Sequence, residues 1–228
     1  MNDPASTIAQ ISRSMRLAES VRPDSGKSGV RLLAVSKTRT AGEIRALALL
    51  GQHAFGENYA QEAIAKQGEL ADLDLEWHLI GHLQSNKARA AAVAFDWVQS
   101  VDRIKLVAEL ARHRPEYMRP LNVLVQVNID DEASKSGCRP EDAFVLAEAI
   151  AAEPRLLLRG LMAIPAPDPD MESRRDAFRA MKHLFDAFAA RHPAIDTLSM
   201  GMSEDFELAI AEGATMVRIG TALFGERS

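Results

Sequence analysis

The chain has 228 residues and a mass of 24.9 kDa, with 47% hydrophobic and 26% charged residues, a composition typical of globular proteins. Its formal net charge of −5 argues against a broad nucleic-acid-binding face, and no apolar run is long enough to span a membrane. The only cysteine, Cys138, excludes an internal disulfide bond and a cysteine-rich metal site. Because the N-terminal region lacks the apolar core of a signal peptide, we expect a cytoplasmic protein.

The chain opens with a predicted helix over residues 7–21, followed by a linker over residues 22–29 that is rich in proline, glycine and serine. An apolar run over residues 31–37 predicts the first strand. The helix after this strand begins with a capping box, in which Thr40 and Glu43 precede an apolar helix face.

From there, strands and helices alternate to the end of the chain. Strands are predicted at residues 53–56, 76–80, 97–100, 121–128, 156–162, 197–200 and 216–219. Helices are predicted at residues 59–70, 85–93, 103–112, 140–151, 171–190, 204–211 and 221–224.

These elements amount to eight strand–helix units, counting the first strand. They indicate a single (β/α)8 barrel domain over residues 1–228, with residues 1–30 forming an extra N-terminal helix and linker. A doubly wound open sheet is the alternative. That fold needs a glycine-rich turn after the first strand, which the sequence does not offer.

Lys37 ends the first predicted strand, and active-site groups of such barrels lie at the C-terminal ends of the strands. Leu33, Val35 and Lys37 share one face of the strand. If that face is the barrel interior, the amine projects into the mouth of the barrel. A desolvated lysine there can form a Schiff base with a carbonyl group. A lysine turned toward solvent is the alternative.

The loops after the last two predicted strands indicate an anion site. Recurrent phosphate sites of this fold use these loops and the N-terminus of a short extra helix, whose backbone N–H groups face the anion. The candidate residues are Ser199, Gly201, Ser203, Gly220 and Thr221. The alternative interpretation is that the glycines only mark the ends of helices and that Ser203 is an ordinary N-cap of the next helix.

His78 and His82 stand four residues apart, a spacing that suits two metal ligands on one helix. Gly81 would interrupt that helix, and no third ligand is evident in the sequence. We therefore expect no metal site.

Several motifs make a family resemblance specific. They are LAVSKT (33–38), FGENYAQE (55–62), WHLIGHLQSNK (77–87), SKSG (134–137), GLMAIP (160–165), LSMGMS (198–203) and VRIG (217–220). In this order they closely resemble the pyridoxal 5′-phosphate homeostasis protein family. Members of that family have the barrel of the N-terminal domain of alanine racemase, the fold-type III class of pyridoxal phosphate proteins. The resemblance implies this barrel as the fold and pyridoxal 5′-phosphate (PLP) as the cofactor.

The resemblance also implies a role for each matching residue. Lys37 would hold PLP as an internal aldimine, a Schiff base, and Arg218 would face the pyridine nitrogen. An arginine stays protonated, so it donates to an unprotonated ring nitrogen and leaves the ring a weaker electron sink. Asn58 and His78 resemble ring-side contacts, and Lys135 resembles a family lysine thought to act in cofactor exchange. The residues implied to contact the phosphate are Ser199, Ser203, Gly220 and Thr221.

The function implied by the resemblance is that of a non-catalytic PLP carrier and regulator, which maintains intracellular PLP homeostasis and can deliver the cofactor to apo-enzymes. An amino-acid racemase is the alternative. Racemisation needs acid–base groups on both faces of the substrate adduct. In alanine racemase one of them is a partner-subunit tyrosine that works with an additional β-domain.

This chain offers only Tyr59 and Tyr117, and no residues remain for such a domain, so we favour the carrier and expect a monomer. A Schiff-base aldolase on the same fold is a third possibility, which would use a lysine without the complete phosphate site.

Overall fold

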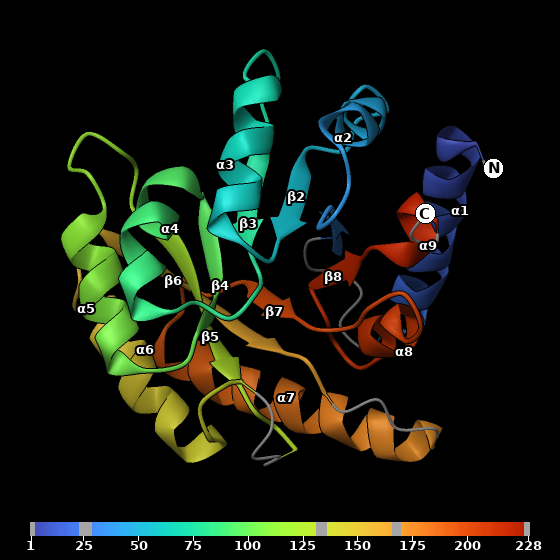
Figure 1. Ribbon diagram of the computed structural model, residues 1–228. Coiled ribbons are helices and arrows are strands. Elements are labelled where there is room, and N and C mark those ends of the chain that lie inside the picture. Colours follow the sequence, from blue (N-terminus) through green and yellow to red (C-terminus); the bar gives the residue numbers. More distant parts are fainter. Residues whose placement is uncertain (1–2, 23–28, 131–135, 166–169, 226–228) are drawn as a thin grey trace.

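The computed structural model describes residues 3–22, 29–130, 136–165 and 170–225. Its centre is a closed barrel of parallel strands, in which each strand pairs with the next along the chain and the last pairs with the first (Figure 1). The strands are β1 (Arg31–Val35), β2 (Ala54–Glu57), β3 (Glu76–Leu79), β4 (Trp97–Val101), β5 (Leu121–Val127), β6 (Leu156–Ala163), β7 (Thr197–Ser199) and β8 (Met216–Ile219). The expected (β/α)8 barrel is confirmed.

Helices surround this barrel and precede it (Figure 1). They are α1 (Pro4–Ser20), α2 (Ala41–Ala48), α3 (Ala60–Glu69), α4 (Ala88–Ala94), α5 (Ile104–His113), α6 (Ala143–Ala151), α7 (Met171–Arg191), α8 (Phe206–Ala211) and α9 (Thr221–Phe224), with the short 3₁₀ helices η1 (Ser85–Lys87) and η2 (Pro140–Asp142). The predicted capping box of α2 is present, because the side chains of Thr40 and Glu43 each accept from the other's backbone N–H. Helix α1 packs against α8 and α9.

The first strand is shorter than the sequence pattern suggests. It ends at Val35, and Lys37 lies in the turn that follows. Leu33 and Val35 face the barrel interior, where they pack with Ala54 and Met216 of the neighbouring strands. The C-terminal end of β1 therefore points Lys37 toward the mouth of the barrel, as the strand pattern predicts.

The interior of the barrel is unusually polar for a packed core. Two small apolar clusters lie inside it, one around Leu33 and one around Trp97. The buried polar residues of the strands include His78, Gln99, Ser199 and Arg218. Because burying a polar group without a partner is costly, these side chains must form hydrogen bonds with one another or with the backbone inside the barrel.

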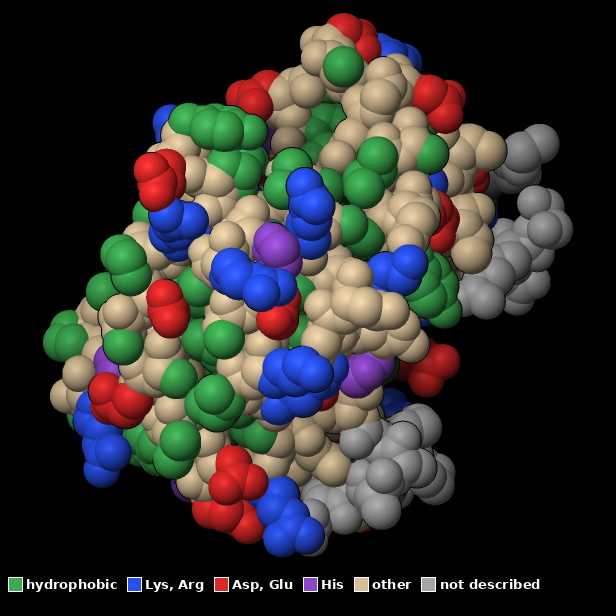
Figure 2. All heavy atoms as spheres, turned by 60° about the vertical axis from the view of Figure 1, so that its left-hand side comes forward, with side chains coloured by type: hydrophobic (Ala, Val, Ile, Leu, Met, Phe, Trp, Pro, Cys, Tyr) green, Lys and Arg blue, Asp and Glu red, His purple; other side chains and the backbone are tan. Residues whose placement is uncertain are grey.

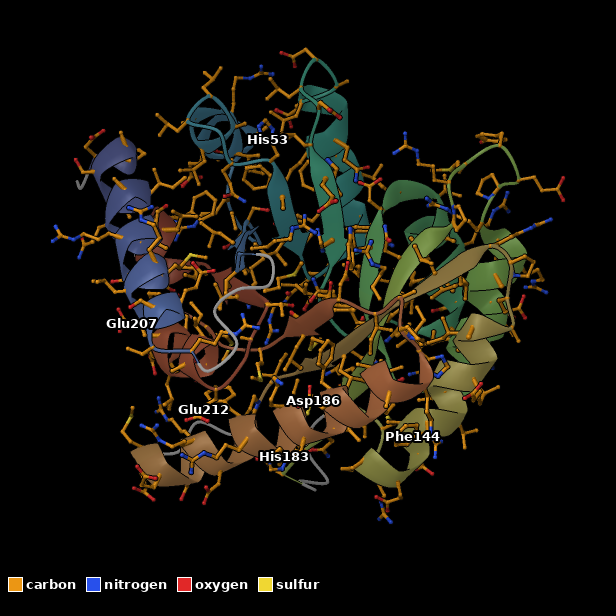
Figure 3. The ribbon with its side chains drawn as sticks, turned by 180° about the vertical axis from the view of Figure 1, so that it is seen from behind. His53, Phe144, His183, Asp186, Glu207 and Glu212 are labelled. Atoms are coloured by element: carbon orange, nitrogen blue, oxygen red, sulfur yellow. The ribbon has the colours of Figure 1, made fainter. Side chains whose placement is uncertain are left out.

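The outer layer is held by contacts between successive helices. Figure 3 shows Phe144 of α6 beside α7, and the rings of Phe144 and Phe188 lie with their centroids 4.1 Å apart. Glu212, which follows α8, lies above α7 in the same view and accepts from Arg175 at 2.9 Å and from Arg179 at 3.2 Å. These contacts fix α8, and with it the loop between β7 and α8, against the barrel.

Charged side chains are mixed on the surface. On the face drawn in Figure 2, basic and histidine side chains lie near one another in the centre, with acidic side chains between and beside them. This pattern agrees with the small net charge. None of the described helices combines the length and the apolar character that crossing a bilayer needs.

Candidate functional site

A cavity of about 600 Å³ opens at the C-terminal ends of the strands. Six of the residues singled out from the sequence line it together: Lys37, Asn58, Ser203, Arg218, Gly220 and Thr221. The other lining residues are Val35, Ile80, Gly81, His82, Gln126, Ser136, Ile164, Pro165, Arg174, Met202, Glu204 and Asp205. The cavity is thus where a barrel of this type places its ligand site.

Lys37 is half-buried in the turn after β1 and borders the cavity. The next residue, Thr38, has a φ of 65°, a conformation that β-branched residues adopt at a cost in strain. The backbone N–H of Thr38 donates to Oε1 of Glu62 on α3 at 2.6 Å. A side chain of a surrounding helix therefore holds the strained turn that carries the lysine.

A buried ion-pair network lies beneath this turn, between β2 and α3. The Lys66 ammonium donates to the backbone oxygen of Ser36, to Glu57 and to Glu62, each at 2.7 Å. The Ser36 hydroxyl donates to the same Glu57 oxygen at 2.6 Å. Glu57 is fully buried, and its second oxygen, Oε2, has no hydrogen-bond partner within the described residues. Burial raises the pKa of Glu57, although hydrogen bonds from Lys66 and Ser36 oppose this.

Glu57, Glu62 and Lys66 were not selected from the sequence as site residues, although Glu57 and Glu62 belong to the FGENYAQE motif. The available signal was Glu62 and Lys66 four residues apart on one helix, a pattern that usually indicates a solvated ion pair. The deep burial of Lys66 depends on the barrel strand behind it, which local spacing does not reveal.

Arg218 lies on β8 with only 3% of its surface exposed and borders the cavity. Its Nη1 donates to the Ser199 hydroxyl at 2.8 Å, and its Nη2 donates to the backbone oxygen of Ala163 at 2.7 Å. Burial lowers the pKa of Arg218 to about 10, so the guanidinium is still charged at neutral pH. The charge is oriented by acceptors on two other strands.

Ser203 is not the N-cap of α8, which was the alternative interpretation of this residue. Helix α8 begins only at Phe206, and it is Asp205 that accepts from the backbone N–H of Met202, at 2.7 Å. The hydroxyl of Ser203 instead faces the start of α9, where the N–H of Ala222 donates to it at 3.4 Å. The two loops of the predicted anion site therefore meet at the cavity, and Gly220 and Thr221 border it from the other side.

Three of the residues predicted to contact a ligand do not line the cavity. Gly201 has a φ of 91°, and a Cβ there would stand 2.5 Å from the Cβ of Ala209, so a glycine is required by packing against α8. Ser199 is fully buried beneath Arg218. His78 is also fully buried and stacks on Trp97 with ring centroids 5.0 Å apart.

His82, rather than His78, borders the cavity; β3 ends at Leu79, and the chain bends at Gly81 before His82. Within the described residues, no group of three or more His, Cys, Asp or Glu side chains is placed to hold a metal ion. Lys135 lies outside the described residues.

The donor set of the cavity has a clear chemical character. The donors that border this space include the primary amine of Lys37, the buried guanidinium of Arg218 and three hydroxyl groups, and helix α9 begins at its edge with Thr221. An amine bonds to carbonyl carbons, a guanidinium donates to a ring or anionic acceptor, and clustered N–H and O–H donors suit a phosphate. The residues present therefore fit a small phosphorylated aromatic aldehyde.

Comparisons with known proteins agree with this fit. A family model described as "Alanine racemase, N-terminal domain" matches residues 15–228. The chain is 51% identical to the pyridoxal phosphate homeostasis protein of Pseudomonas aeruginosa over 228 residues, covering 100% of this chain and 97% of the relative. It is 48% identical to the protein of the same name from Escherichia coli over 230 residues, covering 100% of this chain and 98% of that one.

Among solved structures, the chain resembles PipY of Synechococcus elongatus with PLP bound. The TM-score is 0.84 at 37% sequence identity, and the match covers 98% of this chain and 100% of PipY.

Proposed function

The chain belongs to the pyridoxal phosphate homeostasis protein family, within the alanine racemase N-terminal domain family, and from this premise we propose that it binds PLP in the cavity at the C-terminal end of the barrel. One observation carries the proposal. Lys37, in the turn after β1, and Arg218, on the neighbouring strand β8, line one cavity with the donors of Ser203, Gly220 and Thr221. The function of the protein is PLP homeostasis.

Each of these residues has a separate task. When bound, PLP supplies an aldehyde and an electron-poor ring. The Nζ of Lys37 provides the amine for covalent attachment, and the loops around Ser203 and Thr221 provide donors for the phosphate. Arg218 would hold the ring nitrogen by donating to it and, because it keeps its proton, would not pass one to the ring.

Three arguments support a carrier that holds and releases the cofactor. Arg218 favours the less electron-withdrawing form of the ring. Neither tyrosine of the chain lines the cavity: Tyr117 is 88% exposed, and Tyr59 borders a smaller neighbouring hollow. The cavity also opens directly to solvent through residues such as His82, which suits exchange with an apo-enzyme.

The test is to titrate the purified protein with PLP and follow the absorbance of the bound cofactor. Borohydride reduction and peptide mapping then identify the attachment site. We expect saturable binding with the label on Lys37. A protein that gains no absorbance band after PLP is added would overturn the proposal. Sustained exchange at Cα of single amino-acid enantiomers in deuterated water would instead favour a racemase.

A further inference from the structure

A line of buried polar side chains runs through the barrel interior from Arg218 to the opposite end of the barrel. Its members come from four strands: His78 on β3, Gln99 on β4, Ser199 on β7 and Arg218 on β8. His78, Gln99 and Ser199 are fully buried, and none of the three lines the cavity. The proposed binding of PLP does not itself account for them.

The hydrogen bonds of this line all run in one direction. Arg218 donates to the Ser199 hydroxyl at 2.8 Å, and that hydroxyl donates to Oε1 of Gln99 at 2.7 Å. Nε2 of Gln99 then donates to Nδ1 of His78 at 2.9 Å, and Nε2 of His78 donates to Glu76 at 2.7 Å. Since a guanidinium can only donate and a carboxylate can only accept, the two ends set the orientation of every group between them.

The protonation states of His78 and Glu76 agree with this direction of the hydrogen bonds. Burial lowers the pKa of His78, so the ring is neutral, with one nitrogen to donate and one to accept. Burial alone would raise the pKa of Glu76, but the hydrogen bond from neutral His78 and the charge and hydrogen bond of Arg31 lower it to about 2. Glu76 is therefore a permanent carboxylate at the N-terminal rim of the barrel, where Arg31 also donates to it.

Packing also restricts the movement of these side chains perpendicular to the chain of hydrogen bonds. The His78 ring is stacked on Trp97, at an interplanar angle of 12°, and the amide of Gln99 also contacts the sulfur of Met216 at 3.2 Å. At the other end, Nη2 of Arg218 is held by the Ala163 oxygen. Both terminal nitrogens of the guanidinium thus have fixed acceptors, which sets the plane of the group.

We propose that Glu76, His78, Gln99 and Ser199 form a positioning relay that fixes the guanidinium of Arg218 for the ring nitrogen of PLP, although His78 and Gln99 do not border the cavity. The inference rests on the proposed function. In this arrangement His78 is a positioning residue, not a contact of the ring. A fully satisfied buried network has a single low-energy arrangement, so removing one link frees the groups on both sides of it.

The test compares Gln99→Met with Gln52→Met. Methionine fills a similar volume in both variants but cannot donate or accept in the same way. Gln52 is a matched control, because it is also buried and donates to the backbone oxygens of Leu32 and Ala54, outside the relay. Both variants lose buried hydrogen bonds and should unfold at lower denaturant concentrations than the wild type.

The relay predicts that only Gln99→Met changes how PLP is bound. We expect about tenfold weaker binding in the absorbance titration, since a hydrogen bond that orients a charged group is lost. The pH at which the absorbance of the bound cofactor changes should also increase. The positive guanidinium, once it is no longer held at the ring nitrogen, disfavours protonation of the cofactor less. His78→Phe, which keeps an aromatic ring against Trp97 but ends the relay, should move both quantities in the same direction by less.

The outcomes separate the two proposals. A wild-type protein that does not bind PLP overturns the proposed function. A wild-type protein that binds PLP, with folded Gln99→Met and His78→Phe variants that match it in affinity and absorbance, overturns the relay alone. If Gln99→Met does not fold, His78→Phe decides by the same two measurements. Equal losses of affinity in Gln52→Met and Gln99→Met would also contradict the relay.

Discussion

The Lys66 ammonium donates to the backbone oxygen of Ser36 at 2.7 Å, so helix α3 holds the residue that immediately precedes Lys37. The same ammonium pairs with Glu57 and Glu62, and Glu62 accepts from the backbone N–H of Thr38 on the other side of the lysine. The turn that presents Lys37 to the cavity is thus fixed on both sides by one buried cluster. Its geometry depends on α3 as much as on β1.

Substitution Lys66→Met is expected to destabilise the protein strongly. It leaves Glu57 buried without its charged partner, which costs on the order of 3–5 kcal/mol of unfolding free energy. Denaturant unfolding would measure the loss. The control is Lys182→Met, because Lys182 pairs with the largely exposed Asp186 on α7 and contributes about 1 kcal/mol or less. Similar losses in the two variants would contradict the structural role given to Lys66.

Substitution Lys37→Ala is expected to abolish covalent attachment of PLP while leaving weaker binding through the phosphate donors. Mass spectrometry after borohydride reduction measures this directly. Lys87→Ala is the matched control, because Lys87 is an exposed lysine on the rim of the neighbouring hollow. A label that persists on the peptide around position 37 in Lys37→Ala would show that another group holds the cofactor.

The lowered pKa of Glu76 predicts that the folded protein loses stability in acid. Its folded-state pKa of about 2 lies below the ordinary value of 4.5, so its contribution is present above pH 4.5 and is lost as the pH falls toward 2. The difference in unfolding free energy between the wild type and Glu76→Gln should therefore be constant above about pH 4.5 and shrink as the pH falls from there toward about 2. Asp74→Asn changes an exposed carboxylate at the same end of the barrel and serves as the control. A difference for Glu76→Gln that stays constant with pH would refute the assignment.

Substitution Gly201→Ala is expected to lower stability by roughly 2–4 kcal/mol, because it combines a positive φ with a clash against Ala209. The folded fraction should bind PLP with unchanged affinity, since Gly201 does not border the cavity. Gly68→Ala is the control: a Cβ there meets nothing within 4 Å, and alanine favours the helix by about 0.5–1 kcal/mol. If a fully folded Gly201→Ala protein bound PLP more weakly than the wild type, Gly201 would have to contribute to the ligand site.

The sequence was informative where function follows from position along a strand. Alternating strands and helices predicted the barrel, and the rule that ligands bind at the C-terminal ends of strands selected Lys37, Gly220 and Thr221, which do border the cavity. Arg218 and Asn58 came from the family resemblance and border it as well. Their contacts with the cofactor remain a prediction.

What the sequence did not reveal depends on contacts across the barrel. Gln99 is one amide in an apolar strand, and its role exists only because Ser199 and His78, far away in the chain, lie on either side of it. His78 was expected beside the ring, but it lies within β3, which ends at Leu79, and its side chain is fully buried inside the barrel. Ser203 looked like an N-cap because the start of α8 cannot be placed to within two residues from the pattern.

The hydrogen bond from Thr38 to Glu62 has a consequence for amide exchange. Thr38 is an exposed residue in a turn, where a backbone N–H would ordinarily exchange with deuterium from the solvent at once. Here the exchange rate of this one amide reports how often α3 and the Lys37 turn separate. It therefore monitors the stability of this contact without any ligand, at a position beside the lysine itself.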